Sequence, residues 1–339
     1  MTENGQDDIR KKGQVPKPVV CFLGPVSSYT HQATTGVFPE DRFELMPVTT
    51  IKDIFDTTQS GRATFGVVPF ENSTNGSVVF TLDNFADRTN MYADLNVCHE
   101  VYLDVHHCLL GHINKPASAQ EASGGSRSRP LHDLSHIRRI YSHPQAFGQC
   151  RAFLGAWLPG IETIDVSSTS RAAELAFADK TGESAAISSA AAAVLLGLDM
   201  LAQNIEDRED NTTRFFVLRR GITPIPGGEG ILPDLNDGDD SALLSRTKSL
   251  LSFTVPHRSP GALADLLSCF HREGLNLTSI NSRPSLTGDM AFEYVFFVEF
   301  EGHRYRDPRG RVARVLEDVK GTARTWRWLG SWENMLPRA

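Results

Sequence analysis

The chain has 339 residues, of which 40% are hydrophobic and 22% are charged, and its formal net charge is −7 with an isoelectric point near 5.9. This length allows two or three domains, each with its own core. The acidic balance argues against a nucleic-acid-binding protein, which usually presents a basic face, and no apolar run is long enough to cross a bilayer. Five scattered cysteines without a C-x-x-C pair indicate reduced thiols, so we expect a cytoplasmic protein without a membrane partner.

Three segments depart from the globular pattern. Residues 1–17 mix acidic and basic side chains and lack an apolar signal core, so we expect a disordered lead-in. Residues 114–135 are rich in Ser, Gly and Pro and predict a surface insertion, whereas residues 221–244 predict an interdomain linker. We therefore place a large domain at 18–220 and a small domain at 245–335.

In chain order, the large domain repeats one local design, in which an apolar run is followed by a polar turn and a helix-like pattern. The apolar runs are 19–23, 65–69, 137–141, 161–166 and 185–187. Short strands that alternate with helices predict an α/β fold with a parallel or mixed sheet. Ligands of such sheets bind beyond the carboxyl ends of the strands, where helix N-termini offer free N–H groups to a small anion. Ser and Thr are also ordinary helix caps, so one turn alone does not make a site.

One segment is rich in metal-ligand residue types, namely His99, His106, His107, Cys108 and His112. A strand through residues 101–110 would place His106 and His107 on opposite faces, and no spacing here matches a zinc pattern. The chain also lacks a Walker loop, a dinucleotide-binding glycine fingerprint and a G-x-S-x-G elbow. We therefore expect neither a metal nor another cofactor.

A dense polar cluster precedes the apolar run from Phe215 to Leu218. It consists of Asn204-Ile205-Glu206-Asp207, followed by Asn211-Thr212-Thr213-Arg214. Such a cluster at the mouth of a buried strand is a candidate site, but a turn with a helix cap and a surface salt bridge explains it equally well.

The small domain predicts the order β-α-β-β-α-β. Strands are expected at 250–255, 275–280, 292–300 and 325–329, and helices at 263–270 and 312–319. Phe292, Tyr294, Phe296, Val298 and Phe300 alternate strictly, which is typical of a half-buried strand. This order is that of the ferredoxin-like motif.

Four motifs occur in one order along the chain. They are Gly24-Pro25-x-x-Ser28-Tyr29-Thr30-His31-x-Ala33, Glu71-Asn72-Ser73-x-x-Gly76-x-Val78, Ser142-His143-Pro144-Gln145-Ala146 with Gln149-Cys150, and Asn204-Ile205-Glu206-Asp207 with Asn211-x-Thr213-Arg214-Phe215. With them the chain resembles the prephenate dehydratase family over about Val19 to Trp332. The resemblance implies two α/β subdomains, similar to a periplasmic-binding-protein fold, with the active site between them. The chain would cross near 101–110 and return near 204–218.

The resemblance also implies a reaction, the loss of carbon dioxide and the ring hydroxyl from prephenate to give phenylpyruvate. Thr213 is then the expected hydroxyl beside the leaving group, as a donor or through a relay, and Glu71 is the alternative acid. Arg214 is expected to pair with a substrate carboxylate, or equally to brace Glu206 or Asp207. The full set of expected substrate-binding residues is Ser28, Asn72, Ser73, Ser142, Gln149, Thr169, Thr212, Arg214 and Phe215.

The small domain resembles the ACT domain that follows the catalytic part in this family. Gly261-Ala262-Leu263-Ala264 matches a Gly-Ala-Leu-Val-type loop, and Asn281-Ser282-Arg283-Pro284 matches a Glu-Ser-Arg-Pro-type loop. The resemblance implies that both loops, paired across a homodimer or within a homotetramer, hold phenylalanine as a feedback inhibitor. A dimerisation module that binds nothing is the alternative.

The chain departs from the family pattern at four positions. Ser27 stands where the family has Gly, Arg171 where an acidic residue is common, Asn281 for Glu and Ala264 for Val. Two other functions remain open, an arogenate dehydratase and a non-catalytic amino-acid sensor. The Thr213-Arg214-Phe215 segment argues against the sensor.

Overall fold

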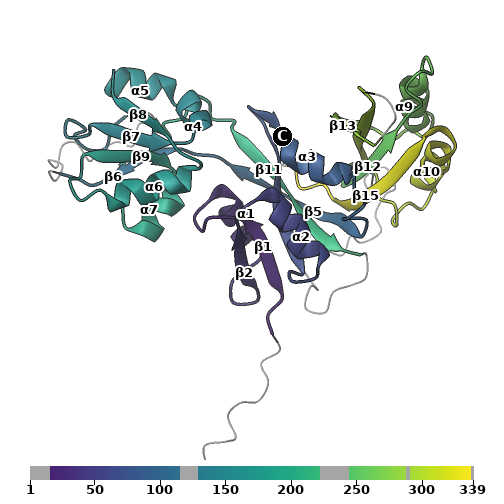
Figure 1. Cartoon of the computed structure of the whole chain (residues 1–339), viewed down its shortest axis with the longest axis horizontal. Helices are drawn as coiled ribbons and strands as arrows, with labels where there is room; N and C mark the ends of the chain where they lie inside the picture. Colours follow the sequence, from purple (N-terminus) through teal and green to yellow (C-terminus); the bar gives the residue numbers. More distant parts are fainter. Residues whose placement is uncertain (1–15, 115–128, 222–243, 288–290, 337–339) are drawn as a thin grey trace, which may run out of the picture.

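The computed structural model describes residues 16–114, 129–221, 244–287 and 291–336. The expected lead-in, most of the insertion and most of the linker lie outside these residues. The described strands form two sheets, and the predicted mixed α/β architecture is confirmed (Figure 1). In the described ranges, no helix is both long enough and apolar enough to traverse a bilayer.

The first lobe is built on three strands and a short strand that pairs with one of them. These are β1 (Val19–Leu23), β2 (Glu44–Val48), β3 (Phe65–Asn72) and β4 (Gly76–Ser77), with helices α1 (Tyr29–Val37), α2 (Ile51–Gln59) and α3 (Val79–Ala86). β1 pairs in parallel with β2 and β3, so the carboxyl ends of β1 and β3 reach the same edge of the sheet. The long strands β5 (Leu95–Asp104) and β11 (Thr212–Arg220) extend this sheet, because β11 lies antiparallel between β3 and β5.

The second lobe has its own five-stranded sheet in the order β10-β6-β9-β7-β8. Its strands are β6 (Cys108–Gly111), β7 (Arg139–Ser142), β8 (Glu162–Asp165), β9 (Ser184–Ser188) and β10 (Asp199–Ala202), and its helices are α4 (Pro144–Gln149), α5 (Arg151–Trp157), α6 (Thr169–Ala178) and α7 (Ala190–Leu196). The expected continuous strand through 101–110 is wrong. β5 ends at Asp104 and β6 begins at Cys108 in the other sheet, because the amide of Val105 donates to the Asn211 carbonyl and that of His107 donates to the Glu206 carboxylate.

The C-terminal part shows the predicted β-α-β-β-α-β order. Its elements are β12 (Thr247–Thr254), α9 (Ala262–Arg272), β13 (Leu277–Pro284), β14 (Tyr294–Glu301), α10 (Arg311–Thr322) and β15 (Thr325–Glu333). The two helices place their apolar stripes on the sheet, where residues such as Leu266, Phe270 and Val315 are fully buried. Each such side chain contributes roughly 1.5–3 kcal/mol by leaving water.

The C-terminal sheet continues the sheet of the first lobe. β15 pairs in parallel with β5, where Gly330 lies opposite Val97. A Cβ atom at Gly330 would lie 2.0 Å from the Val97 carbonyl oxygen, so glycine permits the two strands to meet. Below this junction, Trp332 packs edge-on against Phe216 of β11, with ring centroids 5.0 Å apart. One hydrophobic core therefore runs from the first lobe into the C-terminal part.

Candidate active site

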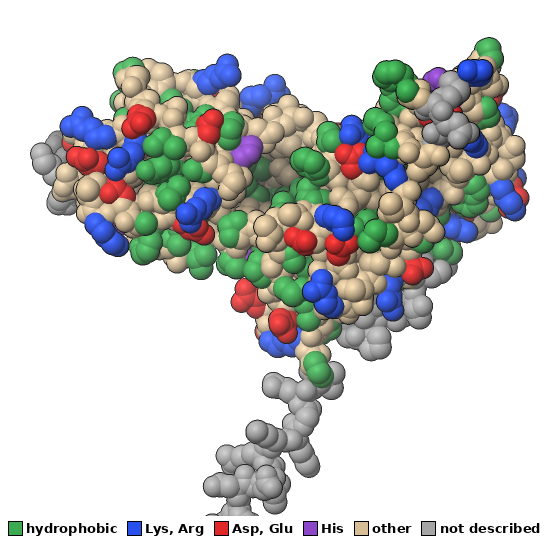
Figure 2. Space-filling model, viewed as in Figure 1, with side chains coloured by type: hydrophobic (Ala, Val, Ile, Leu, Met, Phe, Trp, Pro, Cys, Tyr) green, Lys and Arg blue, Asp and Glu red, His purple; other side chains and the backbone are tan. Residues whose placement is uncertain are grey.

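The two lobes enclose a cleft of about 490 Å³. Figure 2 shows the surface hollowed between the lobe at the left and the centre of the molecule. The first residues of three helices line it: Tyr29 and Thr30 of α1, Val79 and Phe80 of α3, and Thr169 and Ser170 of α6. The turns that precede these helices therefore lie together around one cleft, which is the arrangement that binding of a small anion by several helix N-termini needs.

The helix N-termini give the cleft a positive character without a cationic side chain. Ser28 accepts a hydrogen bond from the His31 amide and Ser168 from the Arg171 amide, whereas no side chain caps α3. Among the described residues that line the cleft, none is Asp, Glu, Lys or Arg. A ligand carboxylate would therefore be held by helix dipoles, N–H groups and hydroxyls rather than by an ion pair.

Thr213 and Asn72 lie side by side at the base of the cleft. They are register partners on β11 and β3, and the Asn72 amide nitrogen donates to the Thr213 hydroxyl oxygen at 2.9 Å. The same nitrogen donates to Asn211 Oδ1 at 2.8 Å, while the amides of Thr74 and Asn75 donate to Asn72 Oδ1. The backbone thus fixes the orientation of Asn72, and Thr213 accepts its hydrogen bond, so the Thr213 hydrogen is available to a ligand.

Gln149 connects the second lobe to this network. Its amide nitrogen donates to Thr74 Oγ1 at 3.1 Å, and the Thr74 hydroxyl lies 2.7 Å from Asn72 Oδ1. The Gln149 oxygen lies 2.8 Å from Nε2 of His107, whose Nδ1 lies 3.0 Å from the Tyr29 hydroxyl. Burial lowers the pKa of His107, which favours a neutral ring.

The acidic residues of the polar cluster have structural partners. The Glu206 carboxylate contacts the His107 amide at 2.9 Å and His106 Nδ1 at 3.0 Å. Asp207 accepts from the amides of Arg151 and Ala152 at the start of α5. These contacts hold the crossing segment and α5 in place and leave neither acid among the residues that line the cleft.

Two expected site residues, Glu71 and Arg214, point away from the cleft. They are register partners of each other, one position along from Asn72 and Thr213, so their side chains lie on the opposite face of the sheet. Neither lines the cleft. The expected pairing of Arg214 with Glu206 or Asp207 is wrong, because its guanidinium contacts the carboxylates of Glu100 and Glu299.

Three more expected substrate-binding residues brace the site instead of lining it. Ser142 is fully buried and donates to the Ile187 carbonyl at 2.9 Å. Ser73 donates to the Asp210 carbonyl at 2.7 Å, and Thr212 donates to Asp104 at 2.7 Å. Ser28, Asn72, Gln149, Thr169, Thr213 and Phe215 do line the cleft together.

The contacts of Arg214 form a buried cluster between the catalytic strands and the C-terminal sheet. Arg214 Nε donates to Glu100 at 2.8 Å, and Lys248 Nζ lies 3.3 Å from Glu299. Burial alone would lower the pKa of Arg214, but the Glu299 and Glu100 carboxylates raise it overall. Conversely, burial favours the neutral form of Glu299, but Arg214 and Lys248 hold its pKa below its usual range. Arg214 and Glu299 are therefore both ionised.

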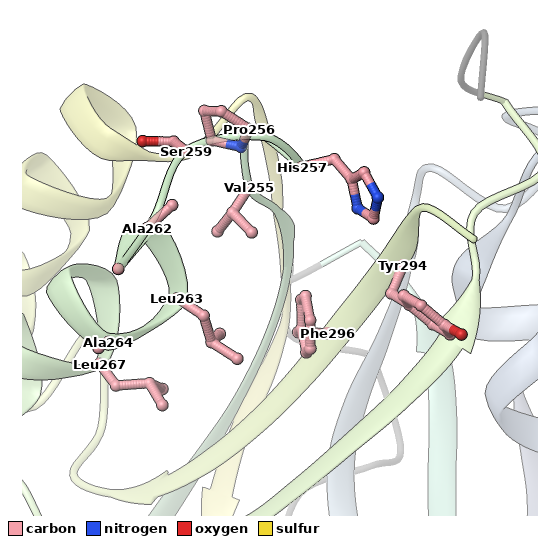
Figure 3. A pocket seen from close by; sticks show the side chains of 11 residues that line it. Val255, Pro256, His257, Ser259, Ala262, Leu263, Ala264, Leu267, Tyr294 and Phe296 are labelled. Atoms are coloured by element: carbon pink, nitrogen blue, oxygen red, sulfur yellow. The ribbon is translucent and has the colours of Figure 1, made fainter. Parts of the chain in front are cut away.

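A second cavity, of about 510 Å³, lies in the C-terminal part. Figure 3 shows Leu263 and Leu267 of α9 facing Phe296 and Tyr294 of β14 across it, with His257 at the rim. Gly261, Ala262 and Leu263, all expected effector residues, line this cavity. The other expected residues, Asn281, Ser282, Arg283 and Pro284, lie on β13 and are not part of its lining.

Two of the expected effector residues on β13 contact the first lobe of the same chain. The Ser77 hydroxyl donates to Asn281 Oδ1 at 2.6 Å, and Ser77 itself lines the cleft. Arg283 donates twice to Asp83 of α3, at 2.8 and 3.0 Å. One hydrogen bond therefore connects the expected effector residues on β13 to a residue in the wall of the cleft.

Several residues for which the sequence predicts no substrate role also belong to the site. Tyr29, Asn211 and His107 line the cleft, and Thr74 bonds to two residues of its wall. Asn211 Nδ2 is buried without a hydrogen-bond partner among the described residues, while Asn211 Oδ1 accepts from Asn72. His107 was considered only as a metal ligand, and its spacing gave no sign of its hydrogen-bonding partners.

Known proteins share both the sequence and this architecture. A family model described as "Prephenate dehydratase" matches residues 20–222. This chain belongs to the prephenate dehydratase family. A bifunctional chorismate mutase/prephenate dehydratase of Aquifex aeolicus is 33% identical over 94% of this chain and 74% of its own length.

Solved structures of similar proteins cover nearly the whole chain. A prephenate dehydratase from Arthrobacter aurescens in complex with L-Phe is 27% identical, with a TM-score of 0.75 over 95% of this chain and 92% of that one. GqqA, described as a novel type of quorum quenching acylase, is 26% identical, with a TM-score of 0.69 over 94% and 98% of the two chains. Because one fold carries different named activities, the geometry of the cleft has to identify the chemistry.

Proposed function

We propose that this chain is a prephenate dehydratase that forms phenylpyruvate in phenylalanine biosynthesis. The hydrogen bond from Asn72 to Thr213 carries the proposal, because it leaves the Thr213 hydrogen free to donate into the cleft. A hydroxyl donor beside the leaving oxygen is what departure of hydroxide requires. Glu71, the alternative acid, lies on the other face of the sheet.

The elimination balances without a cofactor. The bond to the ring carboxylate breaks and its electron pair forms the new ring double bond, while the ring carbon–oxygen bond breaks and hydroxide leaves as water after taking a proton. The Thr213 hydroxyl donates to that oxygen, and its proton is restored from solvent. Aromatisation of the ring supplies the driving force.

The uncharged cleft suits both carboxylates of prephenate. Helix N-termini and hydroxyls bind them, and the absence of a cationic side chain in the described lining leaves the departing carboxylate without an ion pair to break. Apolar neighbours such as Val105 and Phe215 offer contact to the ring.

The test is a phenylpyruvate assay with prephenate. We expect Thr213→Val to lower kcat by about 100-fold or more, since general acid or donor assistance contributes 10²–10⁴-fold. Thr213→Ser keeps the hydroxyl and should retain most of the activity. Glu71→Gln is the matched control and should stay near wild type. Normal turnover by Thr213→Val would remove Thr213 from the mechanism.

Two assays separate the remaining alternatives. Faster turnover of arogenate than of prephenate would assign an arogenate dehydratase. Binding of phenylalanine with no product from either substrate, even at high enzyme concentration, would assign a non-catalytic sensor. The hydroxyl donor of Thr213 at the cleft favours the enzyme.

We further propose that the C-terminal part is an ACT domain through which phenylalanine inhibits the enzyme. The cavity beside Gly261 has apolar walls from Leu263, Leu267 and Phe296 that suit an aromatic side chain. Residues 281–284 would complete it from a second copy in a homodimer or homotetramer. Phenylalanine should lower the rate and Leu263→Asp should abolish this inhibition. A rate that is unchanged across a phenylalanine titration would contradict the proposal.

We place the enzyme in the cytoplasm, since all five cysteines are buried as free thiols, which a reducing compartment maintains.

A further inference from the structure

The geometry points to Tyr29 and His107 as a positioning pair that holds the Gln149 amide with its N–H groups toward the substrate. This inference rests on the proposed function, because it concerns how the same cleft binds its substrate. It goes beyond the catalytic motifs, since neither residue was expected to bind or position anything.

The backbone amides that bind Asn72 determine the directions of the side-chain hydrogen bonds from Asn72 to Gln149. The amides of Thr74 and Asn75 donate to Asn72 Oδ1, so this atom is an acceptor and the Thr74 hydroxyl must donate to it. The Thr74 oxygen therefore accepts its other hydrogen bond, and its partner in Gln149 must be the amide nitrogen.

The remaining steps fix the histidine ring. Because the Gln149 nitrogen faces Thr74, the Gln149 oxygen faces His107 Nε2 at 2.8 Å, and an oxygen acceptor requires Nε2 to carry hydrogen. In the neutral ring, Nδ1 is then an acceptor, and the Tyr29 hydroxyl, which lies 3.0 Å from Nδ1 and 2.9 Å from the His106 carbonyl oxygen, is the donor that reaches it. His107 is only 2% exposed, and the Glu206 carboxylate holds its own amide, so the ring cannot easily turn away.

The consequence lies at the Gln149 nitrogen. One of its two hydrogens goes to Thr74 Oγ1, which is this nitrogen's one acceptor in the described part of the chain. Gln149 lines the cleft, so its second hydrogen is available to a substrate carboxylate. If the amide were reversed, its oxygen would face both the Thr74 lone pairs and the anionic substrate. His107, held by Tyr29, prevents this reversal through the hydrogen bond that its Nε2 donates to the Gln149 oxygen.

The pair joins both lobes as well. Tyr29 begins α1 in the first lobe, His107 lies in the crossing segment and Gln149 ends α4 in the second lobe. A series of hydrogen bonds therefore runs from Tyr29 through His107 to Gln149 in the second lobe. From Gln149 it returns through Thr74 and Asn72 to Thr213 in the first lobe.

Substitutions of His107 separate positioning from a structural role. Gln at this position places an amide nitrogen near the place of Nε2 and keeps the donor, whereas Asn replaces Nδ1 alone and does not reach Gln149. We expect His107→Asn and Tyr29→Phe to raise KM for prephenate about 5–20-fold, with kcat changed less than 3-fold, because the hydrogen bond from Gln149 to the substrate carboxylate is weakened and not removed. His107→Gln should restore KM to within about 3-fold of wild type.

A double-substitution cycle tests whether His107 and Tyr29 act through Gln149. In a Gln149→Ala background, neither His107→Asn nor Tyr29→Phe should raise KM further. If the losses multiply, or if His107→Gln is as impaired as His107→Asn while its urea unfolding matches wild type, the inference is overturned. Failure of the wild-type enzyme to convert prephenate would instead overturn the proposed function, so the two results are distinguishable.

Discussion

Arg214 of β11 and Glu299 of β14 form a buried ion pair that joins the strand carrying Thr213 to the C-terminal sheet. Their side chains are only 8% and 1% exposed, and Glu100 and Lys248 complete the cluster. Arg214 also lies over the Phe216 ring, with 4.7 Å between the guanidinium carbon and the ring centroid. The residue beside the proposed catalytic hydroxyl thus belongs to the junction between the two parts.

Arg214→Met should lower the free energy of unfolding by about 3–5 kcal/mol, because it leaves two buried carboxylates with one cation. Urea unfolding followed by circular dichroism measures the loss. Arg208→Met is the control, since Arg208 pairs with Asp210 where both side chains are 67% exposed, and it should leave the free energy of unfolding nearly unchanged. Equal losses for the two variants would show that the cluster does not stabilise the junction.

Asp83→Asn should uncouple the proposed effector site from the cleft. The substitution removes the ion pairs of Asp83 with Arg283 and Arg88 but leaves the residues that line the cavity beside Gly261 unchanged. Calorimetry should show wild-type binding of phenylalanine, while the enzyme assay should show weaker inhibition. Glu273→Gln, which breaks an ion pair with Arg314 inside the C-terminal part, should leave inhibition unchanged. Full inhibition of Asp83→Asn would exclude this contact as a route of coupling.

Gly330→Ala should destabilise the protein by about 3 kcal/mol or more, because its Cβ would meet the Val97 backbone and its φ of 143° disfavours other residues. Gly321→Ala is the matched control in the same part of the chain. Nothing lies within 4 Å of a Cβ there, and the helical site should gain about 0.5–1 kcal/mol. Thermal unfolding compares the two, and an unchanged Gly330→Ala protein would show that the strands need not meet so closely.

His303 should make unfolding sensitive to mild acid. Burial, with the nearby charge of Arg306, lowers its pKa to about 4, whereas the unfolded residue titrates near 6.5. The unfolded state therefore binds the proton first, so His303 destabilises the fold progressively as the pH falls from about 6.5 to about 4. In His303→Gln, unfolding in this range should take up about one proton fewer than in wild type, measured from urea unfolding at several pH values. An exposed His257→Gln variant serves as the control, and identical pH slopes for all three proteins would refute the prediction.

The predicted strands were found where apolar runs are bounded by turns. β1 coincides with the run at 19–23, and the six C-terminal elements occur in the predicted order. β2 escaped prediction because it is an edge strand whose residues are partly or fully exposed and include Pro47, so it has no apolar run. The sequence predicts one strand in place of β5 and β6, because no glycine or proline marks the crossing at residues 105–107.

The candidate site could be predicted only as far as local motifs extend. Asn72 and Thr213 each lie in a motif, but their contact depends on strand register between residues far apart in the chain. Glu71 and Arg214 belong to the same motifs and yet face the other side, since alternation along a strand depends on where the strand begins. The partner of Arg214 in β14 has no local signal at all.

The meeting of Gly330 with Val97 limits how this protein can be recombined. A chimera that replaces residues 247–333 with the corresponding segment of a relative would have to bring a glycine at the junction and a carboxylate for Arg214. A graft without this match would leave Arg214 with Glu100 as its one carboxylate partner and would leave an open strand edge. Compatibility between donor and host is therefore decided by a few interior positions and not by the cavity beside Gly261.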